Sequence, residues 1–414
     1  MFNFFHSINT ANLAFSTSRQ FFQAISGEVM KSDEVTLQEI GASEQRRPIH
    51  AFVIGSGATR VALLGGAHSD EPVGPEMLRL LVNHFITNDE KAHSLLQKYT
   101  FIILPHINPD GEAKNQQWIA RWPDMAAYAQ HAFREEPGRD LEFGYPDMRR
   151  ENKAVSNFLR EYAPFELYIN FHGMAFSEGL MLLIERHWIE QTNQLRGDFQ
   201  QIAESHNLPL HDHDRGGEKG FEYIGPGFTT TPEGRAMQHH FKELDDEETA
   251  SKFGLSSMEY VRSLGGDPLC LVTELPLFTV ALKEESNNTP GLPQAYLEFK
   301  KLVPELRKRA SNGESLEAIV GMFEINHLPL QTAVDIQLSV IEKALEVVQE
   351  DGLFLVAGTR PGQEFGGGED GKRRFGKIFS ISGYNGITAR STGRVVVDSI
   401  FKIIPSATNS FVYN

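Results

Sequence analysis

The chain has only one cysteine, Cys270, among its 414 residues. An intrachain disulfide is therefore impossible, and any metal must be bound by histidine, aspartate and glutamate. Long apolar runs are also missing, since no stretch approaches the roughly 18 apolar residues of a membrane-spanning helix. The N-terminus lacks the basic region and apolar core of a signal peptide. We therefore expect a cytoplasmic protein that does not have a membrane as its partner.

Basic residues are in the minority. The 39 lysines and arginines face 55 aspartates and glutamates, which gives a net charge of −16. Nucleic-acid binding requires a basic surface, so we expect no nucleic-acid partner. Two hydrolase motifs are absent as well: the chain has neither Gly-x-Ser-x-Gly nor His-Glu-x-x-His. Their absence excludes serine hydrolases of the α/β-hydrolase fold and thermolysin-like peptidases.

Short apolar runs alternate with helical patterns along most of the chain. The runs predict buried strands at residues 61–64, 99–105, 165–171 and 268–273, and apolar positions three and four apart predict helices at 75–86 and 151–162. Strands that alternate with helices indicate an α/β fold, with a mostly parallel twisted sheet and helices on both faces. Residues 1–315 are expected to form this catalytic domain.

The pattern changes towards the C-terminus. Apolar residues at helical spacing predict a helix over 331–350. Glycines then separate runs that predict strands at 353–357, 374–381 and 394–404. Residues 330–414 are therefore expected to form a small β-rich C-terminal module.

The strand predicted at 61–64 leads through two glycines to His68 and Glu71. A histidine and a carboxylate three residues apart on such a turn can point at one spot beyond the carboxyl end of the strand, where α/β sheets keep their active sites. The other His-x-x-Glu matches begin at His187 and His240 and follow no apolar run. We interpret these two as solvated helix faces.

Two further predicted strands end in residues of the same kinds, His172 and Glu274. The carboxyl ends of parallel strands lie along one rim of the sheet, so residues about a hundred apart in sequence can converge there. A catalytic zinc usually takes three histidine or carboxylate ligands and leaves one position for water. The shared position at strand ends is therefore a stronger signal than any one of these residues.

At these positions the chain resembles the zinc carboxypeptidase family, of which carboxypeptidase A is the best-known member. Four landmarks occur in the family's order over roughly residues 50 to 280: His68-x-x-Glu71, Asn108-Pro109-Asp110-Gly111, His172 and Glu274. The resemblance implies a zinc hydrolase in which His68, Glu71 and His172 bind Zn²⁺ and Glu274 is the general base.

The resemblance implies further roles near this centre. Arg121 would polarise the scissile carbonyl, and Asp140 would orient the first ligand histidine, as zinc histidines usually require. Tyr260 lies closest in order to the position of the family's substrate-binding tyrosine, and Tyr223 is the other candidate.

One departure from the family concerns the substrate's terminal carboxylate. The family has an Asn-Arg pair after its aspartate, but here Asp140 is followed by Leu141-Glu142-Phe143. Glu142 would repel a carboxylate, whereas an arginine binds one bidentately. Arg262 and Arg235 are our first candidates to replace the missing arginine. Arg149, Arg150 and Arg215 are also possible. Without such a replacement, a free C-terminal carboxylate would be disfavoured and an amidated substrate preferred.

The expected function is therefore hydrolysis of a peptide or amide C–N bond by a metal-activated water. The substrate would be a peptide or a small acylated amino acid. The alternatives are an amidase or N-deacylase, similar to aspartoacylase or succinylglutamate desuccinylase, and an inactive zinc-binding homologue. The missing Asn-Arg pair favours the first alternative, whereas the presence of both Glu274 and Arg121 argues against the second.

The segment His211-Asp212-His213-Asp214 also contains residues of metal-binding types. In an extended chain alternate residues point to opposite sides, so only the two histidines or the two aspartates could share an ion. We interpret this segment as an exposed loop.

Overall fold

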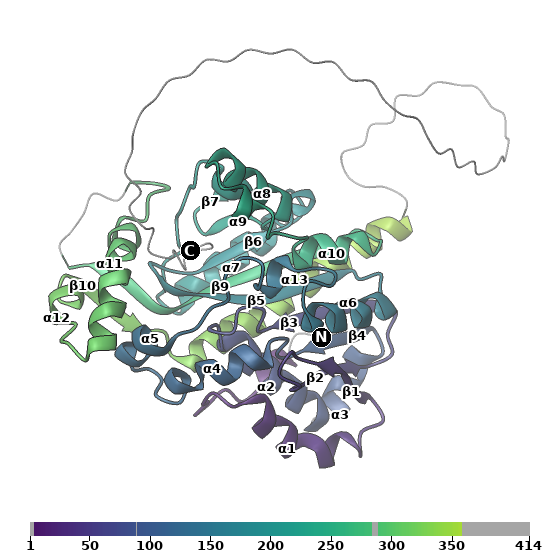
Figure 1. Ribbon diagram of the computed structural model, residues 1–414. Coiled ribbons are helices and arrows are strands. Elements are labelled where there is room, and N and C mark those ends of the chain that lie inside the picture. Colours follow the sequence, from purple (N-terminus) through teal and green to yellow (C-terminus); the bar gives the residue numbers. More distant parts are fainter. Residues whose placement is uncertain (1–3, 88, 284–288, 358–414) are drawn as a thin grey trace, which may run out of the picture.

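The computed structural model describes residues 4–87, 89–283 and 289–357. Within these residues a ten-stranded sheet runs through the molecule, with helices on both sides (Figure 1). The strands are β1 (Val35–Ala42), β2 (Pro48–Ile54), β3 (Thr59–Gly65), β4 (Tyr99–Leu104), β5 (Leu167–Ser177), β6 (Met181–Ile184), β7 (Tyr223–Gly225), β8 (Phe228–Thr230), β9 (Leu269–Leu282) and β10 (Phe323–His327).

The helices alternate with these strands over much of the chain. The α-helices are α1 (Ser18–Val29), α2 (Val73–Thr87), α3 (Asp89–Leu96), α4 (Pro109–Ile119), α5 (Met125–His131), α6 (Arg150–Tyr162), α7 (Asn193–Ser205), α8 (Gly234–Glu243), α9 (Glu247–Ala250), α10 (Ser257–Ser263), α11 (Gln294–Asn312), α12 (Glu317–Val320) and α13 (Leu330–Ala357). The short 3₁₀ helices are η1 (Phe5–Ser7), η2 (Leu141–Phe143), η3 (Arg186–Trp188) and η4 (Glu218–Gly220). None of the helices in the described ranges has the length and apolar character needed to cross a bilayer.

The strand order is β1-β2-β4-β3-β5-β9-β6-β8-β7, and β10 pairs with β9. The central strands β4, β3, β5 and β9 are parallel to one another, which confirms the predicted parallel core of the sheet. Antiparallel pairs flank this core: β1 with β2 and β2 with β4 on one side, and β6 and β10 with β9 on the other. Parallel neighbours require long crossover connections, which here contain helices such as α2 and α6.

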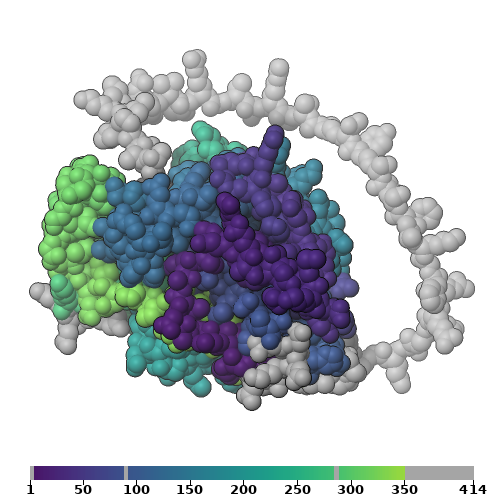
Figure 2. Space-filling model, turned by 90° about the horizontal axis from the view of Figure 1, so that it is seen from below, coloured from purple at the N-terminus to yellow at the C-terminus, as the bar shows by residue number. Residues whose placement is uncertain are grey.

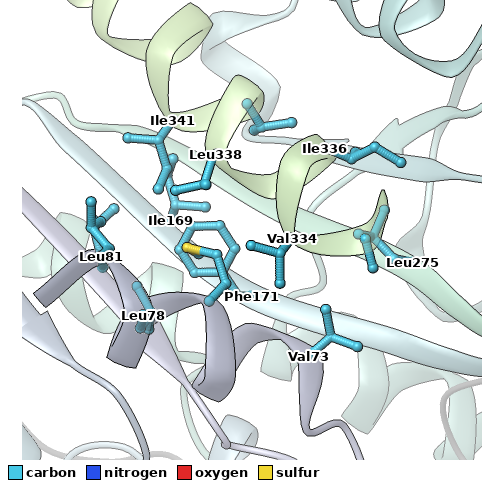
Figure 3. Close-up of a cluster of buried hydrophobic side chains, with 14 of the residues drawn as sticks. Val73, Leu78, Leu81, Ile169, Phe171, Leu275, Val334, Ile336, Leu338 and Ile341 are labelled. Carbon is cyan, nitrogen blue, oxygen red and sulfur yellow. The ribbon is translucent and has the colours of Figure 1, made fainter. Parts of the chain in front are cut away.

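Both faces of the central sheet are buried, because successive side chains of a strand point to opposite faces. In β3, Val61 and Leu63 belong to one hydrophobic core, whereas Ala62 and Leu64 belong to another. The first core lies between the sheet, α2 and α13. Figure 3 shows side chains of both helices gathered around Phe171 of β5. The second core contains apolar residues of α6, α8 and α10.

Helix α13 is part of the first core. Its residues Val334, Ile336 and Ile341 are almost completely buried, and Gln337 lies 3.4 Å from the Thr273 hydroxyl of β9. The assignment of this helix to a separate module from residue 330 is therefore wrong, because its apolar face covers the main sheet. The strand predicted at 353–357 is also wrong, since these residues end the helix. The strands predicted at 374–381 and 394–404 lie outside the described residues.

The N-terminal segment packs against α13. Phe5 of η1 belongs to the first core, and the His6 Nε2 atom lies 3.1 Å from a carboxylate oxygen of Glu342. Figure 2 shows the N-terminal part of the chain, in purple, lying across this face of the molecule. The two ends of the described chain therefore meet on one side of the sheet.

Strands β5 and β9 continue beyond their predicted ends at His172 and Glu274. Their parallel ladder runs on to Ser177 and Thr279 because apolar side chains such as Phe176 and Phe278 continue to pack in the first core. His172 pairs directly with Glu274 in this ladder. The two residues therefore lie side by side within the sheet, rather than at two strand ends.

Candidate metal centre and active site

His68 and Glu71 lie in the turn between β3 and α2, as predicted. The turn requires glycine at position 66, whose φ is +73° and where a Cβ would lie 2.5 Å from Nδ1 of His106. The backbone N–H of Glu71 donates to the carbonyl of His68 at 3.3 Å. This tight turn directs both side chains to the same spot beyond the end of β3.

His172 from β5 joins these two residues. Its Nδ1 atom lies 2.9 Å from Nδ1 of His68 and 2.8 Å from Oε2 of Glu71, and Nδ1 of His68 lies 3.1 Å from Oε1 of Glu71. Ligands of a tetrahedral zinc, bound at about 2.0–2.1 Å, lie roughly 3.3 Å apart. Two imidazoles and one carboxylate at these separations fit a zinc ion. The structure thus brings together all three predicted ligands.

Each of these histidines also has a buried carboxylate beside its second ring nitrogen. Nε2 of His68 lies 3.2 Å from Oδ2 of Asp140, and Nε2 of His172 lies 3.4 Å from Oε2 of Glu142. Such carboxylates fix the ring orientation and the tautomer of metal-binding histidines. Asp140 has the position predicted for it. Glu142, which we interpreted as a residue that would repel substrate, lies against a ligand histidine instead.

The 3₁₀ helix η2 explains why both carboxylates face the metal centre. Oδ1 of Asp140 accepts from the backbone N–H of Glu142 at 2.9 Å and caps this single turn. Glu142 in turn accepts hydrogen bonds from the Ser257 hydroxyl at 2.7 Å and from the Asn170 amide at 2.7 Å. The sequence contained a signal for the role of Glu142 beside a ligand histidine, because Asp140 and Glu142 are two acids two residues apart. We interpreted this stretch by the Asn-Arg pair that it lacks and missed the signal.

Replacing Glu142 by glutamine is expected to weaken zinc binding by about 10- to 100-fold, as for loss of other carboxylates that support metal-binding histidines. Glutamine keeps the size of the side chain but lacks the charge that makes His172 a better donor. Competition with a chromophoric chelator measures the change. Glu151→Gln is the control, because Glu151 is equally buried but pairs with Arg149. Equal zinc affinity in the Glu142 variant and the wild type would contradict this role.

Charges within the cluster shift the pKa values of its members. Burial favours neutral imidazoles, but Glu71 raises the pKa of His172 to about 9, and Asp140 raises the pKa of His68 well above its usual value. Burial alone would raise the pKa of Glu71, yet Arg134 and the two histidines hold it well below its usual value. The surroundings therefore stabilise positive charge between the two rings, as a cation site requires.

Glu274 lies beside this cluster on β9. It is partly buried, and its Oε2 atom is buried without a hydrogen-bond partner among the described residues. Burial and the charge of Glu71 raise the pKa of Glu274 to about 7. A carboxylate with a free oxygen and such a pKa suits a general base near neutral pH.

Arg121 does not reach the metal centre. Its side chain is half exposed and pairs with Asp124 at 2.7 Å, so the predicted role for Arg121 is wrong. The arginine beside the ligands is Arg134, which contacts an oxygen of Glu71 and donates from Nε to Asp70 at 2.8 Å. Arg134 lies in an irregular segment, and no periodic pattern could place it there.

The Asn-Pro-Asp-Gly motif helps to hold that segment. Asn108 caps α4 by accepting from the N–H of Gly111, and its amide donates to Glu135 at 2.7 Å. The side-chain amide of Asn115, in the same helix, makes two hydrogen bonds with the backbone of Phe133. Its nitrogen donates to the Phe133 carbonyl, and its oxygen accepts from the Phe133 N–H. The motif therefore begins helix α4, and this helix holds the residues on either side of Arg134, namely Phe133 and Glu135.

The four predicted substrate-binding residues lie away from the metal centre. Tyr260 is buried and donates to the carbonyl of Ser156 at 2.9 Å, and Tyr223 donates to Asp212 at 2.6 Å. Arg262 pairs with Glu185 at 2.7 Å, and Arg235 is exposed on α8. None of the four lines the cavity next to the metal centre. Their assignment is therefore wrong, because these side chains have other partners or face solvent.

The cavity itself contains a different arginine. It is lined by His68, His172, Glu274 and Arg215, and its remaining wall is mostly apolar, with Phe143, Met181, Leu183, Phe221, Met258 and Val272. The guanidinium of Arg215 lies over the ring of Phe221, 4.6 Å from its centroid. Arg215 was among the wider set of candidates from the sequence, but only the folded chain shows that it shares a cavity with Glu274.

Comparison with known proteins agrees with this centre. Residues 25–208, which include His68, Glu71, Asp140 and His172, match the model of the zinc carboxypeptidase family. The chain is 30% identical over 128 residues to zinc carboxypeptidase A 1 of Anopheles gambiae. The aligned stretch covers 30% of this chain and 30% of the relative. It is 23% identical over 168 residues to carboxypeptidase B of Astacus astacus, which covers 33% of this chain and 54% of the relative. Residues 25–208 of this chain are therefore similar to the zinc carboxypeptidase family. Zinc is accordingly the metal of the centre.

The matched stretches span about a third to a half of the length of these two zinc carboxypeptidases. A solved metallo-carboxypeptidase from Burkholderia cenocepacia is similar to the chain with a TM-score of 0.45 and 15% identity, over 82% of this chain and 70% of that one.

Proposed function

We propose that this protein removes the C-terminal residue of a peptide by zinc-dependent hydrolysis. The observation that supports this most directly is the pairing of His172 with Glu274, which sets a carboxylate with a buried, unpaired oxygen beside the three zinc ligands. A purely structural zinc site has four protein ligands and needs no such base. Three ligands with a neighbouring general base favour a catalyst over an inactive binding protein.

The residues around the metal centre have separate roles in the hydrolysis. His68, Glu71 and His172 would hold the zinc, which when bound would lower the pKa of a water to about 7 and so supply a nucleophile at neutral pH. Glu274 takes a proton from this water and delivers it to the leaving nitrogen. Arg134, the buried cation next to Glu71, holds the carboxylate of this ligand in place. Asp140 and Glu142 keep the two ligand rings in place.

Without a replacement arginine, we expected a free C-terminal carboxylate on the substrate to be disfavoured. The position of Arg215 favours such a carboxylate instead. Glu142 is occupied by His172, Asn170 and Ser257, so its charge is already compensated by hydrogen bonds. Arg215 supplies a cation to the cavity wall. A free C-terminal carboxylate in the cavity would meet this guanidinium, which offers two parallel hydrogen bonds.

We therefore expect a peptide with a free C-terminus to be cleaved with a kcat/KM about 10- to 150-fold higher than its amide, since a hydrogen bond to a charged group contributes about 1.5–3 kcal/mol. Arg215→Gln should remove most of this preference. Arg235→Gln is the matched control, because Arg235 is exposed and lies away from the cavity. A zinc chelator should abolish activity on both substrates. A preference for the amide would show instead that the enzyme is an amidase.

A further inference from the structure

A group of histidines and cations lies next to the catalytic cavity, and apart from Arg215 it has no role in the mechanism above. The rings of His211, His213 and Tyr296 contact one another with centroids 5.0 to 5.8 Å apart. Tyr296 and Lys300 come from α11, and Nζ of Lys300 lies 5.5 Å from the centroid of the Tyr296 ring. Arg215, two residues after His213, connects this group to the cavity.

Two of the three cations of this group have no ion pair among the described residues. Lys219 pairs with Glu218 at 3.4 Å, whereas neither Arg215 nor Lys300 has an ion pair with an acid in the described part of the chain. Burial and the charges of Lys219 and Arg215 lower the pKa of Lys300 to about 8. Asp212, Asp214 and Glu218 equal these cations in number, so the distinguishing feature is that Arg215 and Lys300 are left without an ion pair in the described ranges.

The two nearby aspartates are occupied by other partners. Asp212 accepts hydrogen bonds from the Tyr223 hydroxyl and the N–H of Gly291, and Asp214 accepts from the N–H of Gly216. These contacts stabilise the local loop. They leave the charges of Arg215 and Lys300 available to a ligand.

His211 provides an independent sign of a ligand. Its side chain is 1% exposed, and neither of its ring nitrogens has a hydrogen-bond partner among the described residues. Burial and the adjacent His213, Arg215 and Lys300 hold the pKa of His211 well below its usual value, so the ring is neutral and offers one N–H donor. Buried donors are normally satisfied. The interpretation of this segment as an exposed loop is therefore wrong at His211.

A second metal is a poor fit for this group. Arg215 and Lys300 lie close enough to both histidines to lower their pKa values, and these cations repel a metal ion. Among the described residues, the group with metal-ligand geometry is His68, Glu71 and His172. Neutral N–H donors among cations suit an anion instead.

We infer that Arg215, Lys219, Lys300 and His211 form an anion-binding subsite, and that the residue released by the enzyme is an acidic amino acid. This inference rests on the proposed function. A C-terminal aspartate or glutamate carries two carboxylates. Arg215, which belongs to both the cavity and the cationic group, binds the main-chain carboxylate, while the side-chain carboxylate reaches the two lysines and His211.

The test compares peptides with a blocked N-terminus and a free C-terminus that differ only in their last residue, which is Glu, Gln or Leu. Wild-type enzyme should cleave the Glu peptide with a kcat/KM at least about tenfold higher than the Gln peptide, as expected for charge-assisted hydrogen bonds. Lys300→Met, and independently Lys219→Gln, should bring this ratio close to one. Lys301→Met is the matched control on α11, because Lys301 is exposed, and it should keep the wild-type ratio. A Gln peptide cleaved as well as the Glu peptide overturns the inference, as does an unchanged ratio in both subsite variants.

Binding measurements separate this inference from the proposed function. Calorimetry on zinc-loaded Glu274→Gln protein compares the Glu and Gln peptides without turnover. Tighter binding of the Glu peptide that depends on Lys300 supports the subsite even if the wild type hydrolyses no peptide, and in that case only the proposed function fails. Hydrolysis of the Leu and Gln peptides together with equal binding of Glu and Gln overturns the subsite and leaves the proposed function standing.

Discussion

Replacing Glu274 by glutamine is expected to lower kcat by about two to four orders of magnitude, as for loss of a general base. Glutamine has nearly the same shape, so the β5–β9 ladder and the three zinc ligands should be retained. Zinc content, measured by elemental analysis, should therefore equal that of the wild type. Glu324→Gln serves as the control, because Glu324 is an exposed glutamate on the neighbouring strand β10. Near wild-type turnover in Glu274→Gln would assign the base to another residue.

The pH profile gives a second measure of the same role. Burial and the charge of Glu71 raise the pKa of Glu274 to about 7, and a bound Zn²⁺ would lower it because a nearby cation favours the ionised carboxylate. A general base acts in its ionised form, so kcat/KM of the wild type should rise with pH through this pKa and level off above it. The residual activity of Glu274→Gln should lack this acid limb.

Replacing His172 by alanine is expected to remove most of the bound zinc and to reduce activity below detection. His172 supplies one of three protein ligands, and its Nδ1 atom lies within 3 Å of both other ligand side chains. The loss of a ligand leaves two, too few for a stable catalytic site. His68→Ala should behave in the same way, because both rings contribute equally to the cluster.

The fold should survive these substitutions, since the two hydrophobic cores do not include the ligands. Circular dichroism and thermal unfolding of the zinc-free proteins test this point. His239→Ala is the control, because His239 also faces a glutamate, Glu243, but is largely exposed on α8. If His68→Ala and His172→Ala both keep one zinc per chain, the metal centre has been placed wrongly.

The sequence predicted the metal centre better than its surroundings. Apolar runs of strand length are short-range signals, so β3, β5 and β9 and the ligands attached to them could be found from the residues alone. The same runs misplaced the strand ends, because His172 and Glu274 interrupt an apolar run without interrupting the backbone ladder. A polar residue inside a strand has the same appearance in a sequence as a polar residue that ends one.

Residues outside the regular elements could not be placed in this way. Arg134 and Arg215 lie in irregular segments whose path depends on tertiary contacts, such as those of Asn108 and Asn115 or of Gly291 with Asp212. Helix α13 shows the same difficulty on a larger scale. Its apolar face was evident from Val334 and Ile336, but the sequence did not reveal that the face packs on Phe171 and the neighbouring residues of the main core.

The place of α13 in the chain order has a consequence for synthesis on the ribosome. Every zinc ligand and Glu274 precede Leu330, so the catalytic groups are complete in the nascent chain before the helix that covers the opposite face of the sheet. At about 5–20 residues per second, α13 follows β9 by several seconds. During that interval Leu78, Phe171 and Leu275 lack their helical cover and present apolar surface to water. A nascent chain therefore completes its metal site before this apolar surface is covered.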